Sequence, residues 1–260
     1  MPTTKSLGNR KGGSVMEKRV VVITGAGKGI GLATAKRFAQ NGDLLALNYR
    51  KTGGELVEIV ELAKANGGDA LVIQADLSDH EEAVNFIKKV EEYYGKIDIL
   101  VNNAGILQSK EAHTIEWHEF KRMIDTNLGS TWSCIMTALP GMIERKSGRI
   151  INVSSELGII GFPTYASYCA SKGAIIALTK ALAKEYAHLG ILVNSVAPGP
   201  VVTDMLKYDT IEYNDETRET VPLKRFGEPD EIAAVIEFVA GPGGAFLVGQ
   251  IISPNGGTAI

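Results

Sequence analysis

The sequence predicts an α/β fold, in which a doubly wound parallel sheet is covered by helices on both faces within a single domain. Short runs rich in Val, Ile and Leu alternate along the chain with segments whose apolar residues recur at helical spacing. The connections between these segments are short, as in parallel sheets with crossover helices. No linker, repeat or charge run divides the 260 residues, and their apolar fraction of 45% is ordinary for a globular protein.

The first half of the chain establishes the regular order of elements. Asn41 and Gly42 end the first predicted helix as a C-cap pair, and Gly95 ends the third. Asp79, with Glu82 three residues later, has the spacing of a capping box at the start of that third helix. The predicted strands are 19–24, 44–49, 70–74 and 97–101, and the predicted helices between them are 30–40, 54–65 and 79–94.

The second half continues the alternation with one exception. The stretch 204–224 is polar and acid-rich and follows Pro198, Gly199 and Pro200. Its place between a strand and the last helix predicts a substrate lid on the carboxyl edge of the sheet, although a solvated helical excursion is equally compatible with it. Around it we expect helices at 114–146, 164–189 and 230–240, and strands at 149–153, 191–197 and 250–252.

Composition limits the partners and the compartment. The net charge of −3, without a stripe of Lys and Arg, gives no reason to expect nucleic acid. No run approaches about 18 unbroken apolar residues, so no membrane span is expected. Residues 1–17 are polar and contain Gly and Ser, which predicts a flexible extension rather than a signal peptide. Two cysteines, Cys134 and Cys169, do not make a disulfide framework, and we expect a cytoplasmic protein.

A glycine-rich turn joins the first strand to the first helix. Gly25, Gly29 and Gly31 have the spacing G-x-x-x-G-x-G, which permits a tight turn and a close approach of the backbone to a pyrophosphate. The helix that follows points its N-terminal N–H groups at the same anion. No Lys-Ser or Lys-Thr pair follows Gly29 or Gly31, which excludes a nucleoside-triphosphate loop. The turn therefore predicts a dinucleotide.

The end of the second strand indicates which dinucleotide is bound. An Asp or Glu there would accept hydrogen bonds from the adenosine ribose and favour NAD, but the residues are Asn48, Tyr49 and Arg50. Arg50 can pair bidentately with a 2′-phosphate, and Lys28 in the glycine turn can add a second positive charge. Two cations and no acid favour NADP(H).

Three residues of a later stretch suggest proton transfer. Tyr168 and Lys172 are four apart in a predicted helix, so the phenol and the ammonium share one face. Ser155 follows the strand 149–153, where a hydroxyl would face that helix. Taken alone, the three are equally compatible with surface residues at accidental spacing.

Seven motifs in order along 18–260 resemble the short-chain dehydrogenase/reductase family. Agreement in seven motifs is far more specific than agreement in one, so accidental spacing no longer explains Tyr168 and Lys172. The resemblance implies a Rossmann-type oxidoreductase domain over 18–260. The motifs are TGAGKGIG at 24–31, Asp76 in ADLSD, NNAG at 102–105, Asn127 in DTNLGS, Ser155 in INVSS, YCASK at 168–172 and APGPVVTDM at 197–205.

The resemblance assigns roles by position, and it implies no metal. Asn127, Ser155, Tyr168 and Lys172 match a catalytic tetrad. Asp76 and Leu77 would hold the adenine, 102–105 would shape the floor under the riboses, and the residues after the sixth strand would border the nicotinamide. The implied NADP(H) site comprises Gly25, Lys28, Gly29, Ile30, Gly31, Arg50, Asp76, Leu77, Asn103, Ala104, Gly105, Tyr168, Lys172, Pro198, Gly199 and Thr203.

The chemistry that these positions serve is the reduction of a ketone to a secondary alcohol. Negative charge builds on the carbonyl oxygen, so Tyr168 would act as general acid in reduction and as base in oxidation. Lys172 and the cationic nicotinamide would lower the pKa of the phenol, and Ser155 would hydrogen-bond the oxygen. Asn127 would hold a water that links Lys172 to solvent.

Within the family, the sequence is most similar to 3-oxoacyl-acyl-carrier-protein reductases, through VPLKRFGEPDEIA and GQIISPNGG. Leu189 departs from the basic residue of carrier-binding members, although Lys146 keeps the other charge, and Pro254 and Asn255 replace a Val-Asp pair. The expected substrate is a small carbonyl compound or alcohol, including acyl-carrier-protein or CoA thioesters. An alcohol, polyol or sugar dehydrogenase and a non-catalytic NADP-binding redox sensor are the alternatives. The family implies a homotetramer that uses the long helices.

Overall fold

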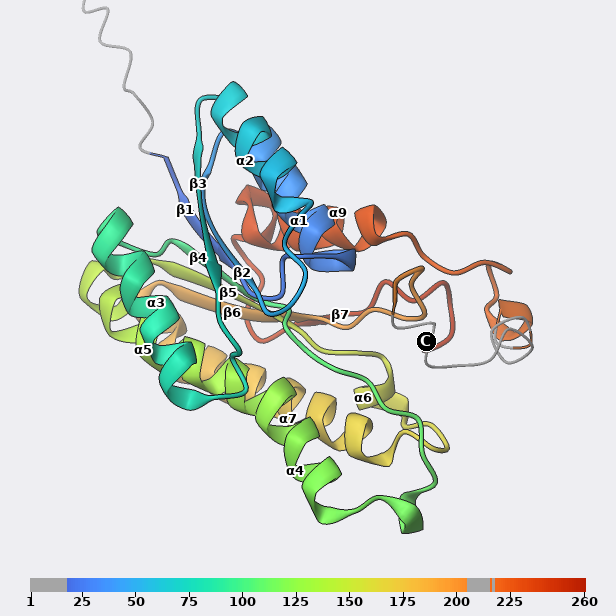
Figure 1. The fold of residues 1–260 in the computed structure, drawn as a ribbon. Helices are drawn as coiled ribbons and strands as arrows, with labels where there is room; N and C mark the ends of the chain where they lie inside the picture. The colour runs from blue at the N-terminus through green and yellow to red at the C-terminus, as the bar shows by residue number, and fades with distance from the viewer. Residues whose placement is uncertain (1–17, 205–215, 217) are drawn as a thin grey trace, which may run out of the picture.

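Seven parallel strands form one sheet in the order β3-β2-β1-β4-β5-β6-β7 (Figure 1). The structure, a computed structural model, describes residues 18–204, 216 and 218–260; the expected extension 1–17 and residues 205–215 and 217 of the predicted lid lie outside the described residues. The predicted single α/β domain with a doubly wound parallel sheet is confirmed. The strands are β1 (Val20–Ile23), β2 (Leu44–Tyr49), β3 (Asp69–Gln74), β4 (Ile99–Asn102), β5 (Gly148–Val153), β6 (Ile191–Val196) and β7 (Ile251–Ile252).

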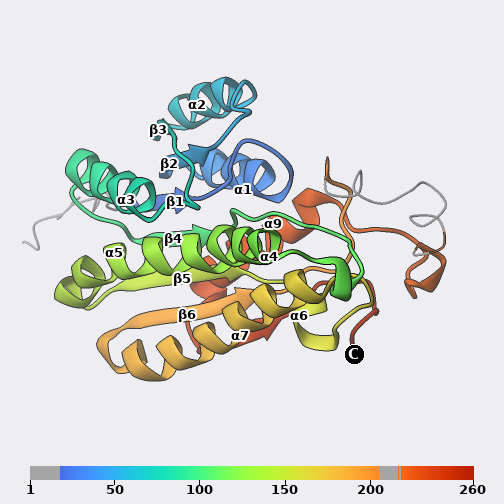
Figure 2. The same cartoon turned by 60° about the horizontal axis from the view of Figure 1, so that its bottom comes forward.

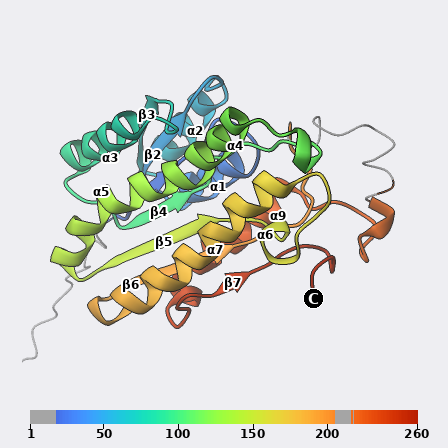
Figure 3. The same cartoon turned by 90° about the horizontal axis from the view of Figure 1, so that it is seen from below.

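Helices cover both faces of the sheet (Figures 2 and 3). One face packs against α1 (Gly29–Gln40), α2 (Leu56–Ala65) and α9 (Pro229–Ala240), and the other against α3 (His80–Tyr94), α5 (Ser130–Arg145) and α7 (Ala166–Tyr186). Alternate residues of β1 enter different cores, because successive side chains of a strand point to opposite faces. Val21 packs with Phe38 of α1, whereas Val22 packs with Phe86 of α3. Burial on both faces explains why these strands are continuous apolar runs.

The strand order reverses at β1. This strand pairs with β2 on one side and with β4 on the other. Chain connections therefore leave in opposite directions from the two sides, and a crevice forms at the carboxyl ends of the strands, where α/β proteins bind ligands. Thr24 after β1 and Asn103 after β4 lie at this point.

The long helix predicted at 114–146 is in fact two helices. A π-helical turn, η2 (Asp125–Gly129), joins α4 (Trp117–Ile124) to α5. Such a turn keeps the chain helical, so a helical pattern alone does not mark where α4 ends and α5 begins. The sequence also does not predict the short helices η1 (Ala112–Thr114), α6 (Leu157–Ile160) and η5 (Pro242–Gly244), and it merges η3 (Ala187–Leu189) with α7.

The predicted caps of α3 are partly correct. The Asp79 carboxylate accepts a hydrogen bond from the Glu82 amide at 3.0 Å, as an N-cap does. The Glu82 carboxylate, however, accepts from the Asp76 amide at 2.7 Å and does not close the box. Gly95 ends the helix in the left-handed conformation, with a φ of 77°. Within the described ranges, no helix has the length and apolar character needed to cross a bilayer.

Candidate active site

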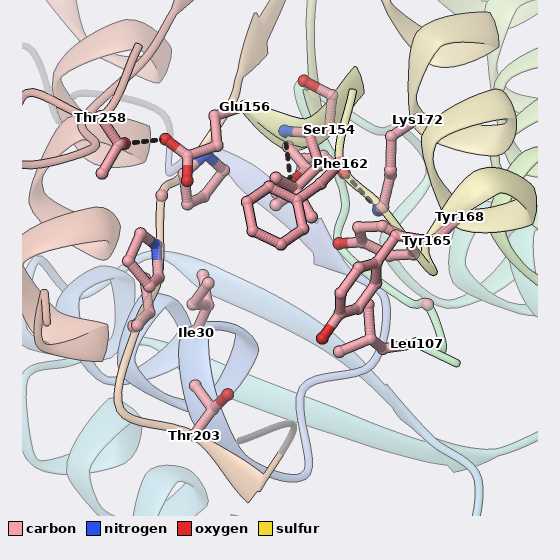
Figure 4. A pocket seen from close by; sticks show the side chains of 18 of the residues that line it. Ile30, Leu107, Ser154, Glu156, Phe162, Tyr165, Tyr168, Lys172, Thr203 and Thr258 are labelled. Carbon is pink, nitrogen blue, oxygen red and sulfur yellow. Dashed lines mark hydrogen bonds between the residues drawn. The ribbon is translucent and has the colours of Figure 1, made fainter. Parts of the chain in front are cut away.

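A cavity of about 340 Å³ opens at the carboxyl ends of β4, β5 and β6 (Figure 4). Ser155, which follows β5, lines it together with Tyr168 and Lys172 from the first two turns of α7. The hydroxyl, the phenol and the ammonium that the sequence singles out are therefore brought to one site. Much of the remaining wall is apolar and consists of Ile30, Ile106, Leu107, Leu157, Ile160, Phe162, Val201 and Phe226.

Tyr168 and Lys172 lie one turn apart on the buried face of α7. The Lys172 ammonium is 5.7 Å from the centroid of the Tyr168 ring, and the two residues are 4% and 8% exposed, Lys172 being the more buried. Lys172 Nζ donates a hydrogen bond of 2.8 Å to the carbonyl of Val153, the last residue of β5. This bond ties the helix to the strand end that carries Ser155, so the three side chains keep a common orientation.

Burial controls the proton affinities of this pair. Loss of water raises the pKa of the Tyr168 phenol to about 12, and the hydrogen bond with Ser155 acts in the opposite direction. The same burial lowers the pKa of Lys172 to about 8. Desolvation disfavours the phenolate and the ammonium alike, so burial opposes the lowering of the Tyr168 pKa expected from Lys172 and the cationic nicotinamide. That lowering stays a prediction.

Asn127, in the π turn, is fully buried behind Lys172. Its Oδ1 accepts from the Ile106 amide at 2.8 Å, and its Nδ2 donates to the Ile106 carbonyl and to the Ser171 hydroxyl, each at 3.0 Å. Gly105 separates the two side chains: a Cβ there would lie 3.2 Å from Asn127 Oδ1 and 3.5 Å from Lys172 Nζ. Gly105 therefore lies between Asn127 and Lys172, and Asn127 itself is not part of the cavity wall.

The glycine turn has the geometry that its spacing predicts. Gly25 and Gly29 have positive φ values of 64° and 55°, which L side chains rarely adopt. A Cβ at Gly31 would lie only 2.3 Å from the carbonyl oxygen of Gly25. Lys28, the N-cap of α1, makes no side-chain cap bond, and the first turn of α1 contains no acidic residue. The helix N-terminus therefore keeps backbone donors for an anion.

Thr24 and Asn103 connect this turn to the end of β4. Thr24 Oγ1 accepts hydrogen bonds from the amides of Asn103 at 2.9 Å and Ala104 at 3.0 Å. Asn103 Nδ2 donates to the carbonyls of Thr24 at 3.0 Å and Gly25 at 3.1 Å. Thr24 was not among the predicted binding residues, although it begins the glycine motif, and its contacts make it a positioning residue for both loops.

The two predicted cations both lie near carboxylates. Arg50 is 3.7 Å from Asp76 Oδ2, and Lys28 is 3.2 Å from Asp204 Oδ2, measured from guanidinium and ammonium nitrogens. The expectation of no acid beside Arg50 is wrong, because β3 pairs with β2 and brings Asp76 to the same edge. All four side chains are at least one-third exposed, so both pairs are weak.

The remaining predicted residues lie either outside the cavity wall or in it. Leu77 is 4% exposed and packs in the core beside α3, which leaves its backbone rather than its side chain for an adenine. Gly25, Lys28, Gly29, Gly31, Arg50, Asp76 and Ala104 lie outside the cavity wall, toward the turn between β1 and α1 and the end of β3. The predicted residues in the cavity wall are Ile30, Asn103, Gly105, Ser155, Tyr168, Lys172, Pro198, Gly199 and Thr203.

Several cavity residues are not among the predicted site residues, and Glu156 and Thr258 are two of them. The Glu156 carboxyl lines the wall directly after Ser155 and accepts a hydrogen bond from Thr258, near the C-terminus. An acidic residue beside a catalytic motif was the available signal, but its burial could not be read from neighbouring residues. The described part of the chain contains no cluster of His, Cys, Asp and Glu that could hold a metal ion.

Comparisons with known proteins agree with this geometry. The family model described as short chain dehydrogenase matches residues 19–214. A 3-oxoacyl-[acyl-carrier-protein] reductase FabG of Staphylococcus aureus (strain MW2) is 40% identical over 236 residues, which cover 91% of this chain and 96% of that protein. The FabG of Thermotoga maritima is 37% identical over 250 residues, with 94% and 99% covered.

Two solved structures have the same fold. A Serratia marcescens short-chain dehydrogenase/reductase double mutant superposes with a TM-score of 0.86 at 31% identity. A blue fluorescent protein from a metagenomic library, in complex with NADPH, superposes with a TM-score of 0.87, also at 31% identity. Each match covers 93% of this chain and 98% of the other.

Proposed function

This chain belongs to the short-chain dehydrogenase family and is an oxidoreductase, and on that premise we propose that it reduces ketones to secondary alcohols with NADPH. The observation that carries the proposal is the convergence of Ser155, Tyr168 and Lys172 on one cavity at the switch point of the sheet. The same cavity wall contains Gly105, Pro198 and Gly199, from the loops after β4 and β6. These side chains are the proton donors that reduction of a ketone in this cavity needs.

The residues present fit NADPH. The uncapped N-terminus of α1 and the close approach of Gly31 to Gly25 leave backbone donors and space for a pyrophosphate. Arg50 and Lys28 would hold the 2′-phosphate. Its two negative charges compete well for these cations with the exposed carboxylates of Asp76 and Asp204. A relative of the same fold has been solved with NADPH. When bound, NADPH supplies the hydride that reaches the carbonyl carbon.

Tyr168 acts as the general acid of the reduction. With a pKa of about 12 its phenol stays protonated at neutral pH, so it holds a proton for the carbonyl oxygen as negative charge develops there. The Ser155 hydroxyl hydrogen-bonds the same oxygen. Lys172 would hold the nicotinamide ribose, while Asn127 orders the loop around Gly105 from behind.

The leading substrate class is a 3-oxoacyl thioester, since the relatives are named as reductases of 3-oxoacyl-[acyl-carrier-protein]. The apolar wall near α6, with Leu157, Ile160 and Phe162, suits an acyl chain. The positions expected to contact the carrier protein lie away from the cavity. Lys146 precedes β5 and Leu189 precedes β6, so both lie at the amino edge of the sheet, opposite the cavity of the same chain. A CoA thioester therefore tests the chemistry without relying on that surface.

The decisive test is the Tyr168→Phe variant. We expect wild-type protein to oxidise NADPH in the presence of acetoacetyl-CoA, and the variant to lose about 10²- to 10⁴-fold in kcat, the usual contribution of a general acid. NADPH binding, followed by fluorescence, should persist, although Tyr168 is one of the expected cofactor contacts, and this separates lost chemistry from lost folding. If Tyr168→Phe reduces acetoacetyl-CoA as fast as the wild type, Tyr168 is not the general acid.

A further inference from the structure

Glu156, one residue after the proposed catalytic Ser155, carries a buried carboxyl that lines the cavity. The residue is 6% exposed, and its backbone amide donates a hydrogen bond of 3.0 Å to the carbonyl of Pro198. It is thereby held between the end of β5 and the loop after β6, at the start of α6. In Figure 4 the carboxyl lies on the side of Thr258, across the cavity from Tyr165.

The protein satisfies only part of the hydrogen-bonding capacity of the Glu156 carboxyl. Thr258 Oγ1 is within hydrogen-bond distance of a Glu156 oxygen and also of the Asn255 carbonyl, at 3.0 Å from the latter. A hydroxyl has a single proton and cannot donate it to both. The influences on the Glu156 carboxyl are burial, which raises its pKa, and the Thr258 bond, which lowers it. A carboxyl in this position retains capacity to accept a further hydrogen bond.

The C-terminal segment is folded so as to bring Thr258 to Glu156. Asn255 Nδ2 donates to Ser253 Oγ at 3.1 Å and to the Ala259 carbonyl at 2.7 Å, while its Oδ1 accepts from the Gly257 amide at 2.8 Å. This turn closes against Gly199, where a Cβ would lie 2.7 Å from the Asn255 Cα. The Glu156 carboxyl is therefore held in place by an ordered C-terminal turn.

The rest of the neighbouring wall is apolar. Leu157, Ile160 and Phe162 follow Glu156 along the chain and line the same cavity, as does Phe226. A buried acceptor among apolar side chains costs free energy unless a donor meets it. A ligand that brings such a donor would recover that cost, whereas a ligand with its own carboxylate would add a second negative charge.

We propose that Glu156 is a specificity-determining residue that accepts a hydrogen bond from a hydroxyl group of the substrate, close to the reacting carbonyl. The site then prefers hydroxyketones over ketones of equal size and disfavours oxo acids. This inference rests on the proposed ketone reduction and names, for the same cavity, a substrate class different from the 3-oxoacyl thioesters that the names of the relatives suggest.

The test compares matched substrates with NADPH. Hydroxyacetone carries a hydroxyl group that can donate a hydrogen bond. Methoxyacetone has similar electronic character but no hydroxyl, and butanone has the size of hydroxyacetone but no hydroxyl. Pyruvate carries a carboxylate in place of the hydroxyl-bearing carbon. We expect wild-type kcat/KM for hydroxyacetone to exceed that for methoxyacetone and butanone by about tenfold or more, the size of a hydrogen bond to a charged group. Pyruvate should be the poorest substrate.

Two variants separate hydrogen bonding from charge. Glu156→Val removes the acceptor, so the hydroxyacetone-to-methoxyacetone ratio should fall to near one. Glu156→Gln keeps an acceptor oxygen that can still bond Thr258, so the ratio should fall only in part, while pyruvate gains because the negative charge is gone. Glu92→Gln, the same change on the exposed side of α3, is the matched control and should keep the wild-type ratios.

The outcomes are distinguishable. If the wild type reduces ketones but its hydroxyacetone-to-methoxyacetone ratio of kcat/KM is near one, the role of Glu156 is overturned and the proposed function stands. The same holds if Glu156→Val keeps the wild-type ratio. A purely structural role would lower the melting temperature and scale kcat/KM for all four compounds alike, which also overturns the inference. A wild type that reduces no ketone overturns the proposed function and the inference with it.

Discussion

At the scale of residues, burial rather than charge pairing sets the proton affinities in the cavity. The phenol of Tyr168 and the ammonium of Lys172 lose water together, so the pKa of one rises to about 12 and that of the other falls to about 8. This combination suits reduction, because the phenol remains a donor while the cation persists at neutral pH. The Glu156 charge also raises the pKa of Tyr168, which works in the same direction.

The pH dependence of reduction should follow Lys172. Because burial lowers its pKa to about 8, the ammonium is present below that pH and lost above it, whereas the Tyr168 phenol stays protonated throughout. We expect kcat/KM for acetoacetyl-CoA to fall above about pH 8 with the loss of one proton, in steady-state assays with NADPH. In Lys172→Arg the alkaline limb should disappear, since a guanidinium does not titrate there. A wild-type profile that is flat well above that pH would contradict this assignment.

Cofactor choice is also decided by single side chains. Arg50→Asp should weaken NADPH binding about tenfold or more and NADH binding little, because it replaces the cation for the 2′-phosphate by a second anion beside Asp76. Fluorescence titration with both cofactors measures this. Lys89→Asp, the same charge reversal on the exposed side of α3, should leave both affinities unchanged. Equal losses for NADPH and NADH in Arg50→Asp would refute the phosphate assignment.

At the scale of elements, two irregular segments position the site. The π turn η2 turns Asn127 inward, so that its amide satisfies the backbone of Ile106 and the hydroxyl of Ser171 in a fully buried position. The glycine turn before α1 brings Gly31 against Gly25 and holds Asn103 over both. Each departs from regular structure where a polar group must reach a ligand or a loop.

The glycine turn can be tested by adding one methyl group. In Gly31→Ala the new Cβ would lie 2.3 Å from the Gly25 carbonyl oxygen and 2.6 Å from Asn103 Nδ2, so the turn must open. We expect NADPH affinity to fall about tenfold or more, a change of about 1.4 kcal/mol per tenfold step, in fluorescence titration. Gly54→Ala, before α2, meets no heavy atom within 4 Å and should keep the wild-type affinity. Equal affinities for the two variants would argue against this turn as the pyrophosphate site.

At the scale of the whole molecule, different buried clusters support the two parts of the site. One cluster lies under α1, α2 and α9 and supports the cofactor turn, and a second lies under α3, α5 and α7. A small third cluster contains Tyr168 itself, together with Met123 and Tyr165. Outside the second cluster, Trp132 of α5 is 49% exposed beside a surface hollow shared with Leu128 and Leu178. An exposed aromatic patch of this kind is a candidate contact between copies of the chain.

Assembly as a homotetramer through α5 and α7 remains a prediction. We expect Trp132→Glu to shift the protein from the tetramer to smaller species, because it introduces a charge into an apolar contact. Light scattering coupled to gel filtration measures the mass. Val57→Glu, on α2 and also exposed, is the control and should keep the wild-type mass. A wild-type protein that is monomeric at assay concentrations would refute the prediction.

By itself, the sequence determined the order of strands and helices, most bounds to within about two residues, and the glycine turn. These follow from local periodicity and from motifs whose members are close in the chain, whereas the tetrad was implied by the family resemblance and stays a prediction. A single helix was predicted over α4 and α5, because the π turn between them keeps the chain helical.

Only the tertiary structure decided the electrostatics of the site. The approach of Asp76 to Arg50 depends on the pairing of β2 with β3, and that of Thr258 to Glu156 joins positions 102 residues apart. The direction of the Tyr168 pKa depends on how completely water is removed, which no spacing encodes. Burial and contacts between distant segments are properties of the packed chain, and they determine how the residues named by the sequence can act.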